Sequence, residues 1–343
     1  MEMQAYATTP HSQQESWTPA PPRRHGPPVS VIIAASLLMV ISLTQIAQVV
    51  YQLHLHFGIP GDPGLHTFEF LNSVLPTCVS IVPGCVCAVW LPFGKGAVRV
   101  AALAVTGALA LETLTAVPRH AGSLFHSAGD ESQPVFFVST IVLLALALAT
   151  IGLLSLDSVS TWLRERRPQS PGEPRSPFVS GTHGRRPAGT AAAVTLLLFL
   201  SGAQLVNAGL ELIQTDDQAF ADNTLETIGA IAAHSTVFVC MVMAAVLVIL
   251  RKKAGWPLAI AAASYAIFFC VRGYSALISA ISLSEDAFAS VEPNYLFAAV
   301  VLAIPVVAGV AVVALLGAPR RVDWFYVNPH APVAAQRHAP HRG

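Results

Sequence analysis

Three amide side chains recur along one apolar stretch near the start of the chain, at Gln45, Gln48 and Gln52. Their spacing of three and then four residues places them on one face of an α-helix. A later apolar stretch repeats this pattern with Gln204, Asn207 and Glu211. Amides and a carboxylate in a row can hydrogen-bond a polar solute or attract a cation. The two polar stripes are therefore the first candidates for a solute-binding or pathway function.

The apolar surroundings of the two stripes limit the roles that their polar side chains can have. An amide that faces lipid loses its hydrogen bonds at a cost of several kcal/mol, so each stripe must face protein or water. One interpretation is the wall of a polar vestibule that opens to the outside of the membrane. The other is helix cross-linking, in which each hydrogen bond contributes about 0.6 kcal/mol. The sequence leaves both interpretations open.

Two charged residues, Glu112 and Arg272, fall inside other apolar stretches. An unpaired charge at that depth costs a few kcal/mol. We therefore expect Arg272 to pair with a carboxylate, most simply that of Glu112, or else that of Glu211 or Glu226. Such an intramembrane charge pair suits either a structural or a functional role.

Two further glutamates, Glu69 and Glu226, each follow a threonine by two residues at the start of an apolar stretch. A threonine at a helix N-terminus caps free amides, and a carboxylate in the first turn is stabilised by the helix dipole. The pattern predicts two capped helix starts. The alternative is a pair of acidic residues at the mouth of the polar stripes.

Histidines gather in the first predicted external loop, at His54, His56 and His66, and they are weak candidates for binding Zn or Cu. Their spacing matches no specific ligand motif. A separate histidine, His234, lies within an apolar stretch, where we expect a hydrogen-bonded core residue. The sequence contains no phosphate-binding loop and no hydrolase or metalloprotease motif. We therefore predict no catalytic residues and no cofactor.

The composition identifies the environment of these residues. Hydrophobic residues make up 54% of the 343 and charged residues only 11%, whereas soluble proteins average about 25% charged. Eight apolar stretches are long enough to cross about 30 Å of hydrocarbon. They lie at about 29–53, 67–93, 98–118, 134–157, 188–213, 225–250, 257–282 and 294–318. The sequence therefore predicts an all-α polytopic membrane protein with eight transmembrane helices.

The basic residues predict the orientation. All but Arg119 and Arg272 of the nineteen Lys and Arg residues fall in the tails or in alternate loops, which is the distribution of cytoplasmic segments. Both termini are therefore predicted to be cytoplasmic. The first thirty residues lack the features of a signal peptide, so we expect the first helix to remain as an anchor. A net charge of zero gives no support to nucleic-acid binding.

The second half of the chain resembles the first at an offset of 159 residues. The resemblance depends on matches between polar residues, because any two membrane helices share an apolar composition. The matched pairs are Ser42 with Ser201, Gln45 with Gln204, Gln48 with Asn207, Gln52 with Glu211 and Pro134 with Pro293. The pattern predicts a 4+4 internal duplication. Because each copy has an even number of helices, both cross the membrane in the same direction, as a parallel repeat.

The predicted organisation has five parts. They are a disordered cytoplasmic tail at 1–28, a four-helix repeat at 29–157, a basic cytoplasmic linker at 158–187, a second four-helix repeat at 188–318 and a cytoplasmic tail at 319–343. The abundance of Arg, Ala and Gly suggests a bacterium, and hence the cell membrane. The function we expect is a transporter or permease for a small polar or cationic solute. The alternative is a non-catalytic membrane subunit that docks a partner protein through the linker or the C-terminal tail.

Overall fold

The computed structural model describes residues 26–58, 75–126, 132–166, 188–214, 217–287, 295–318 and 324–325, and all regular structure in these ranges is helical. In chain order the elements are α1 (Val29–Gly58), α3 (Leu75–Trp90), the 3-10 turn η2 (Leu91–Phe93), α4 (Gly96–His126), α5 (Ser132–Leu154), α6 (Asp157–Glu165), α7 (Ala188–Gln214), α8 (Asp217–Ile249), α9 (Gly255–Ala287) and α10 (Tyr295–Gly317). The prediction of an all-α protein is confirmed for these described ranges.

Seven of these helices are long and apolar enough to cross a membrane, namely α1, α4, α5, α7, α8, α9 and α10. The predicted second span corresponds to α3 with η2, whose apolar segment is shorter and runs from Thr77 to Phe93. Residues 67–74 of that predicted span lie outside the described ranges. The seven long apolar helices are those of an integral membrane protein.

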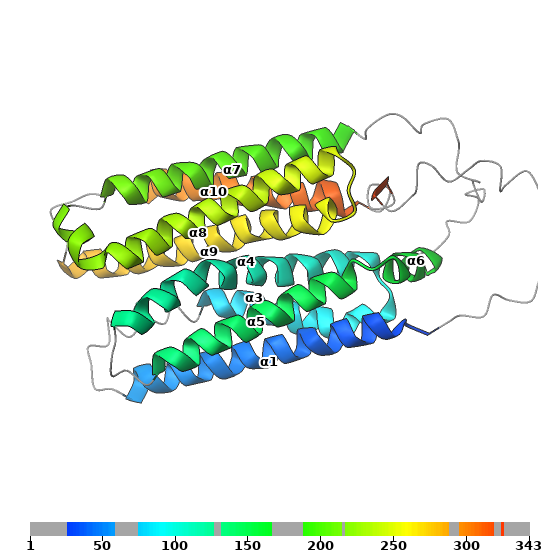
Figure 1. Cartoon of the computed structure of the whole chain (residues 1–343), viewed down its shortest axis with the longest axis horizontal. Helices are drawn as coiled ribbons and strands as arrows, with labels where there is room; N and C mark the ends of the chain where they lie inside the picture. Colours follow the sequence, from blue (N-terminus) through cyan, green and yellow to red (C-terminus); the bar gives the residue numbers. More distant parts are fainter. Residues whose placement is uncertain are drawn as a thin grey trace, which may run out of the picture.

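The helices form two groups, which we call the first unit (α1, α3, α4 and α5) and the second unit (α7, α8, α9 and α10). In the first unit, α1 and α4 each pack against both α3 and α5. In the second unit, α7 and α9 each pack against both α8 and α10. The units meet through α4, which packs against α9 and α8, so α1 and α7 lie on opposite sides of the molecule (Figure 1).

Small residues allow the two units to approach closely. A Cβ atom added at Gly107 on α4 would overlap the Cα and Cβ atoms of Ala261 on α9. The sequence around Ala261 is a run of small residues, and Ala259, Ala262 and Ala263 are fully buried. Without a hydrophobic driving force between helices in lipid, such close backbone packing is a main source of helix association. The α4–α9 contact therefore holds the units together.

One end of the bundle, which we call the basic end, carries four contacts between a cation and a tryptophan ring. The pairs are Lys95 over Trp90, Arg99 over Trp256, Arg166 over Trp162 and Arg251 over Trp324, at 4.3 to 4.9 Å from the ring centroid. Figure 1 shows α6 at the same end. Tryptophans beside Lys and Arg are typical of the membrane–water boundary.

Helix α6 occupies the start of the predicted basic linker. Its sequence is amphipathic, because Val159 and Trp162 on one face are buried while Asp157 lies in the first turn. Gly94, which has a φ of 76° and caps η2, faces the side chains of Trp162 and Arg166. The apolar residues of α6 are spaced by three and four positions, which is the pattern of an amphipathic helix. A search for long uninterrupted apolar stretches does not detect this pattern. Residues 167–187 of the predicted linker lie outside the described ranges.

The predicted helix start at Thr224–Glu226 is wrong. Helix α8 begins at Asp217, seven residues earlier, so Glu226 lies inside the helix and cannot belong to an N-terminal cap. An apolar run marks where a helix enters hydrocarbon, whereas backbone hydrogen bonding continues through the polar segment that precedes it. The corresponding prediction for Glu69 falls outside the described residues, as does most of the N-terminal tail.

Candidate functional site

A cavity of about 500 Å³ lies between α7, α8, α9 and α10, within the second unit. Its floor is formed by buried residues, among them Leu200, Gln204, His234 and Cys270. Its rim is formed by half-exposed apolar residues of α7 and α10, namely Phe199, Val206, Val301 and Ile304. The volume lies in the range of about 300–1,000 Å³ that is typical of small-molecule sites.

The polar side of the cavity is built around Gln204. Its Oε1 atom lies 2.9 Å from Nδ1 of His234 on α8. Because an amide oxygen only accepts hydrogen bonds, His234 donates from Nδ1. The ring of Phe269 meets the imidazole edge to face at 5.7 Å and 85°. The hydrogen bond from His234 therefore fixes the orientation of the Gln204 amide.

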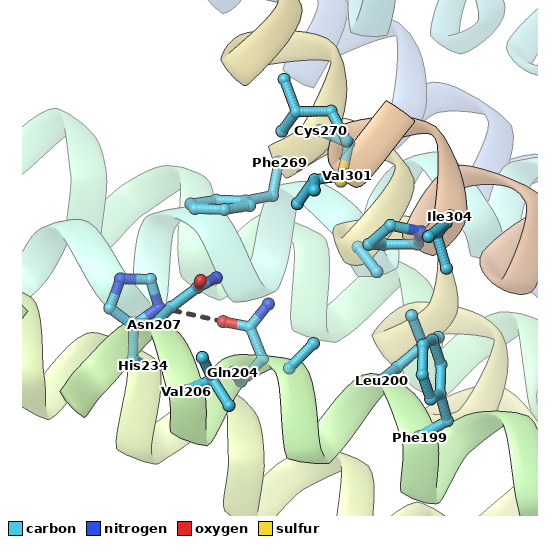
Figure 2. A pocket seen from close by; sticks show the side chains of 14 residues that line it. Phe199, Leu200, Gln204, Val206, Asn207, His234, Phe269, Cys270, Val301 and Ile304 are labelled. Atoms are coloured by element: carbon cyan, nitrogen blue, oxygen red, sulfur yellow. Dashed lines mark hydrogen bonds between the residues drawn. The ribbon is translucent and has the colours of Figure 1, made fainter. Parts of the chain in front are cut away.

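Asn207 extends the polar side of the cavity along α7 by a helical turn. Its side-chain amide lies beside Gln204 and His234 and points into the cavity (Figure 2). The other described lining residues are apolar except for His234, and none of the described residues that line the cavity carries a carboxylate, a guanidinium or an amine. The described lining therefore has two amides and an imidazole on one side and hydrocarbon on the others.

The corresponding stripe in the first unit has a different environment. Nε2 of Gln45 donates to Oγ of Ser80 on α3 at 3.0 Å, and Nε2 of Gln48 donates to Oγ of Ser139 on α5 at 3.3 Å. The adjacent space is filled by a packed apolar cluster of Ile41, Leu109, Ala110, Leu143 and Ala147. In the first unit these amides cross-link helices, whereas in the second unit Gln204 and Asn207 line a cavity.

The two stripes do not face each other. Gln45 is on α1 and Gln204 is on α7, and these helices are separated by α4 and α9 (Figure 1). Each stripe points into its own unit. The remaining stripe residues, Gln52 and Glu211, and the side chain of Glu226 lie outside the described side chains.

The intramembrane charges lie at the contact between the units. Nη1 of Arg272 on α9 is 3.8 Å from Oε1 of Glu112 on α4. The Arg272 side chain is 53% exposed and that of Glu112 is 30% exposed. The pair therefore links α4 to α9 at the edge of the interface and does not line the cavity.

The structure brings no metal site together in the ranges that it describes. His54 is exposed on the last turns of α1, and His56 and His66 lie outside the described side chains. Among the described residues, no three histidine, cysteine, aspartate or glutamate side chains are grouped closely enough to hold an ion.

Sequence reasoning placed Gln204 and Asn207 in the candidate site but not their partners. His234 was expected to be a hydrogen-bonded core residue, and its polar side chain within an apolar helix was the available signal. Phe269 and Pro305 also contribute to the cavity. Phe269 carried no signal in the sequence, whereas Pro305 indicates a kink within its apolar stretch but not a cavity.

No protein-family model, no curated protein and no solved structure matches the chain. The function is therefore inferred from the geometry of the cavity.

Proposed function

We propose that this chain is a membrane permease that binds a small neutral solute in the cavity of its second unit. The observation that carries the proposal is the cavity of the second unit, with the amides of Gln204 and Asn207 on one side. Amide groups at that depth are costly unless they form hydrogen bonds, and a solute that replaces water there gains directional hydrogen bonds. None of the described lining residues carries a carboxylate, a guanidinium or an amine, which favours a neutral solute over a cation.

The proposal retains the predicted topology. It has eight membrane crossings, with α3 and η2 in the second, and the basic end on the cytoplasmic side of the cell membrane. The tryptophans and cations at the basic end support this orientation. The matching packing of α1 with α3 and α5, and of α7 with α8 and α10, supports a parallel duplication of four helices.

In this proposal the two copies have diverged. The first unit, with Gln45 and Gln48 bonded to neighbouring helices, is a rigid support. The second unit carries the solute, and alternating access is a movement of this unit against the first. Alternating access by movement of one repeat against another is a common transport mechanism.

Replacing Gln204 with leucine tests the proposal. We expect Gln204→Leu to abolish transport, because the leucine cannot bond to the solute and leaves His234 without its amide acceptor. The measurement is untargeted mass spectrometry of small molecules in cells and medium, comparing cells with wild-type protein, with the variant and without the protein. A compound whose distribution depends on the wild-type protein should lose that dependence in the variant at equal protein abundance.

The matched control is Gln45→Leu, which removes the equivalent amide from the first unit and its bond to Ser80. We expect this variant to retain transport. Asn207→Leu provides a second test, because Asn207 is only partly buried and its replacement alters the cavity wall more than the fold. Wild-type distributions in both Gln204→Leu and Asn207→Leu would contradict the proposal, as would an equal loss in Gln45→Leu.

The alternative function, a non-catalytic membrane subunit, would dock a partner protein through the linker or through the C-terminal tail, which contains Trp324 and Phe325. In the structure, Phe325 is buried against the bundle, and the carbonyl of Trp324 accepts a hydrogen bond from Nε of Arg251 at 2.7 Å. These residues therefore stabilise the chain's own basic end. The cavity of the second unit favours the permease, which is the function we propose.

A further inference from the structure

We infer that the solute is a neutral amphiphile that reaches the cavity from the bilayer, through the seam between α7 and α10, and places a hydrogen-bond-accepting head at Gln204 and Asn207. This inference deepens the proposed function and rests on it for the step from binding to permeation. It follows from the position of the cavity mouth, the chemistry of its polar side and the nature of its walls.

The mouth of the cavity lies at the level of the hydrocarbon. Phe199 and Val206 belong to the apolar span of α7, and Val301 and Ile304 belong to that of α10. These four side chains are between 46% and 61% exposed. A hydrophilic solute would lose its whole hydration shell at such a mouth at a cost of several kcal/mol, whereas an amphiphile already has its apolar body in the bilayer and loses hydration only at its head.

The polar side of the cavity selects the head group. Because Oε1 of Gln204 accepts from His234, the Nε2 group supplies the donors of this amide. Asn207 adds a second amide beside it. Amide donors suit a carbonyl or hydroxyl oxygen. A charged head would be buried without a counter-ion among the described lining residues, none of which carries a carboxylate, a guanidinium or an amine.

The walls of the cavity suit an apolar body. Phe199 and Phe269 offer aromatic faces, and the rest of the lining is largely aliphatic. Pro305 lies inside α10 and has no N–H, so the Val301 carbonyl lacks its usual helical donor at the seam. A helix weakened at this point can separate from α7 more readily than an uninterrupted one.

At the matched positions, the described residues of the first unit lie in a packed cluster. The sequence alignment pairs Ile41 with Leu200 and Leu143 with Leu302. In the first unit both residues are buried in a packed cluster, whereas their counterparts line the cavity. One amphiphile is therefore expected per chain.

A photoreactive probe tests this inference. The probe is a long-chain primary alcohol with a diazirine next to the hydroxyl-bearing carbon, added to the full chain in lipid nanodiscs. After irradiation, mass spectrometry of the peptides should locate the adducts on residues 199–207 and 301–305. Gln204→Leu is expected to weaken labelling roughly two- to tenfold, the effect of one lost hydrogen bond. Gln45→Leu should label as the wild type does.

A steric variant covers the case in which Gln204→Leu folds poorly. Ala203 lines the cavity, and Ala203→Phe places a ring inside it while leaving the Gln204–His234 bond in place. This variant should lose labelling while its thermal stability remains close to that of the wild type. Labelling that is unchanged in both Gln204→Leu and Ala203→Phe would overturn the inference.

Unlabelled competitors distinguish the sources of the head group. Competition by decylubiquinone points to a ring carbonyl, and competition by monoolein points to an ester and hydroxyl head; either result supports a neutral amphiphile. Competition by glycerol alone would overturn it.

If transport depends on Gln204 but the compound moved is hydrophilic, the inference fails and the permease proposal stands. Specific labelling without any change in compound distribution would support the binding site but contradict the proposal that the chain is a permease.

Discussion

The Gly107→Leu variant is expected to yield almost no folded protein, because the added side chain would occupy the space of Ala261 on α9. A Cβ atom alone at this position would overlap backbone as well as side-chain atoms of Ala261. Overpacking in a well-packed core typically costs about 1–3 kcal/mol, and a clash with backbone lies at or beyond the upper end of that range. The measurement is the yield of monodisperse protein in mild detergent and the midpoint of its thermal unfolding.

The matched control is Gly202→Leu on α7, where an added Cβ would meet no atom within 4 Å. Both substitutions replace a glycine within a long apolar helix, so they gain similar helix propensity. The control is expected to retain wild-type yield and thermal stability. If the two variants unfold at the same temperature, the α4–α9 contact is not the close interface that holds the units together.

The Arg99→Met variant is expected to lower the free energy of unfolding by roughly 2–4 kcal/mol, which combines a lost charged hydrogen bond with a lost cation–π contact. Arg99 is only 2% exposed. Its Nε donates at 2.8 Å to the carbonyl of Leu154, the last residue of α5, and its guanidinium lies over Trp256. Carbonyls at a helix C-terminus lack helical donors, so the variant leaves that of Leu154 without this donor.

The effect of Arg99→Met should extend beyond its own contacts. Trp256 is fully buried and donates from Nε1 to the carbonyl of Leu316 at 3.0 Å, which joins α9 to α10. Lys95→Met is the control, because Lys95 is exposed and contacts only the outer face of Trp90 in the described contacts. Thermal unfolding should show a large decrease for Arg99→Met and a small one for Lys95→Met. Equal decreases would indicate that burial of Arg99 contributes nothing.

The helices themselves could be predicted from the sequence because their signal is local. An apolar run long enough to cross hydrocarbon must be helical, since every backbone group has to be bonded within the segment. Seven of the predicted spans correspond to long apolar helices. The N-terminal end of α8 and the whole of α6 could not be placed from hydropathy, because hydropathy indicates contact with lipid and not the extent of helical hydrogen bonding.

The candidate site was only partly predictable. The spacing of Gln204 and Asn207 showed that they share a helix face, and the cost of lipid-exposed amides showed that this face points inward. The partner of Gln204 is thirty residues away, on another helix, and nothing in its spacing indicates that His234 would meet it. The same is true of Ser80, which bonds to Gln45.

The sequence by itself determined that the chain is an all-helical membrane protein with two inward-facing polar stripes, because hydropathy and helical periodicity are properties of short segments. Only the tertiary structure decided that the two stripes have different environments. Ile41 and Leu143 close the space beside Gln45, while Leu200 and Leu302 leave a cavity beside Gln204. The physical reason is that a cavity depends on the volumes that side chains from four helices fill together, and no single helix contains that information.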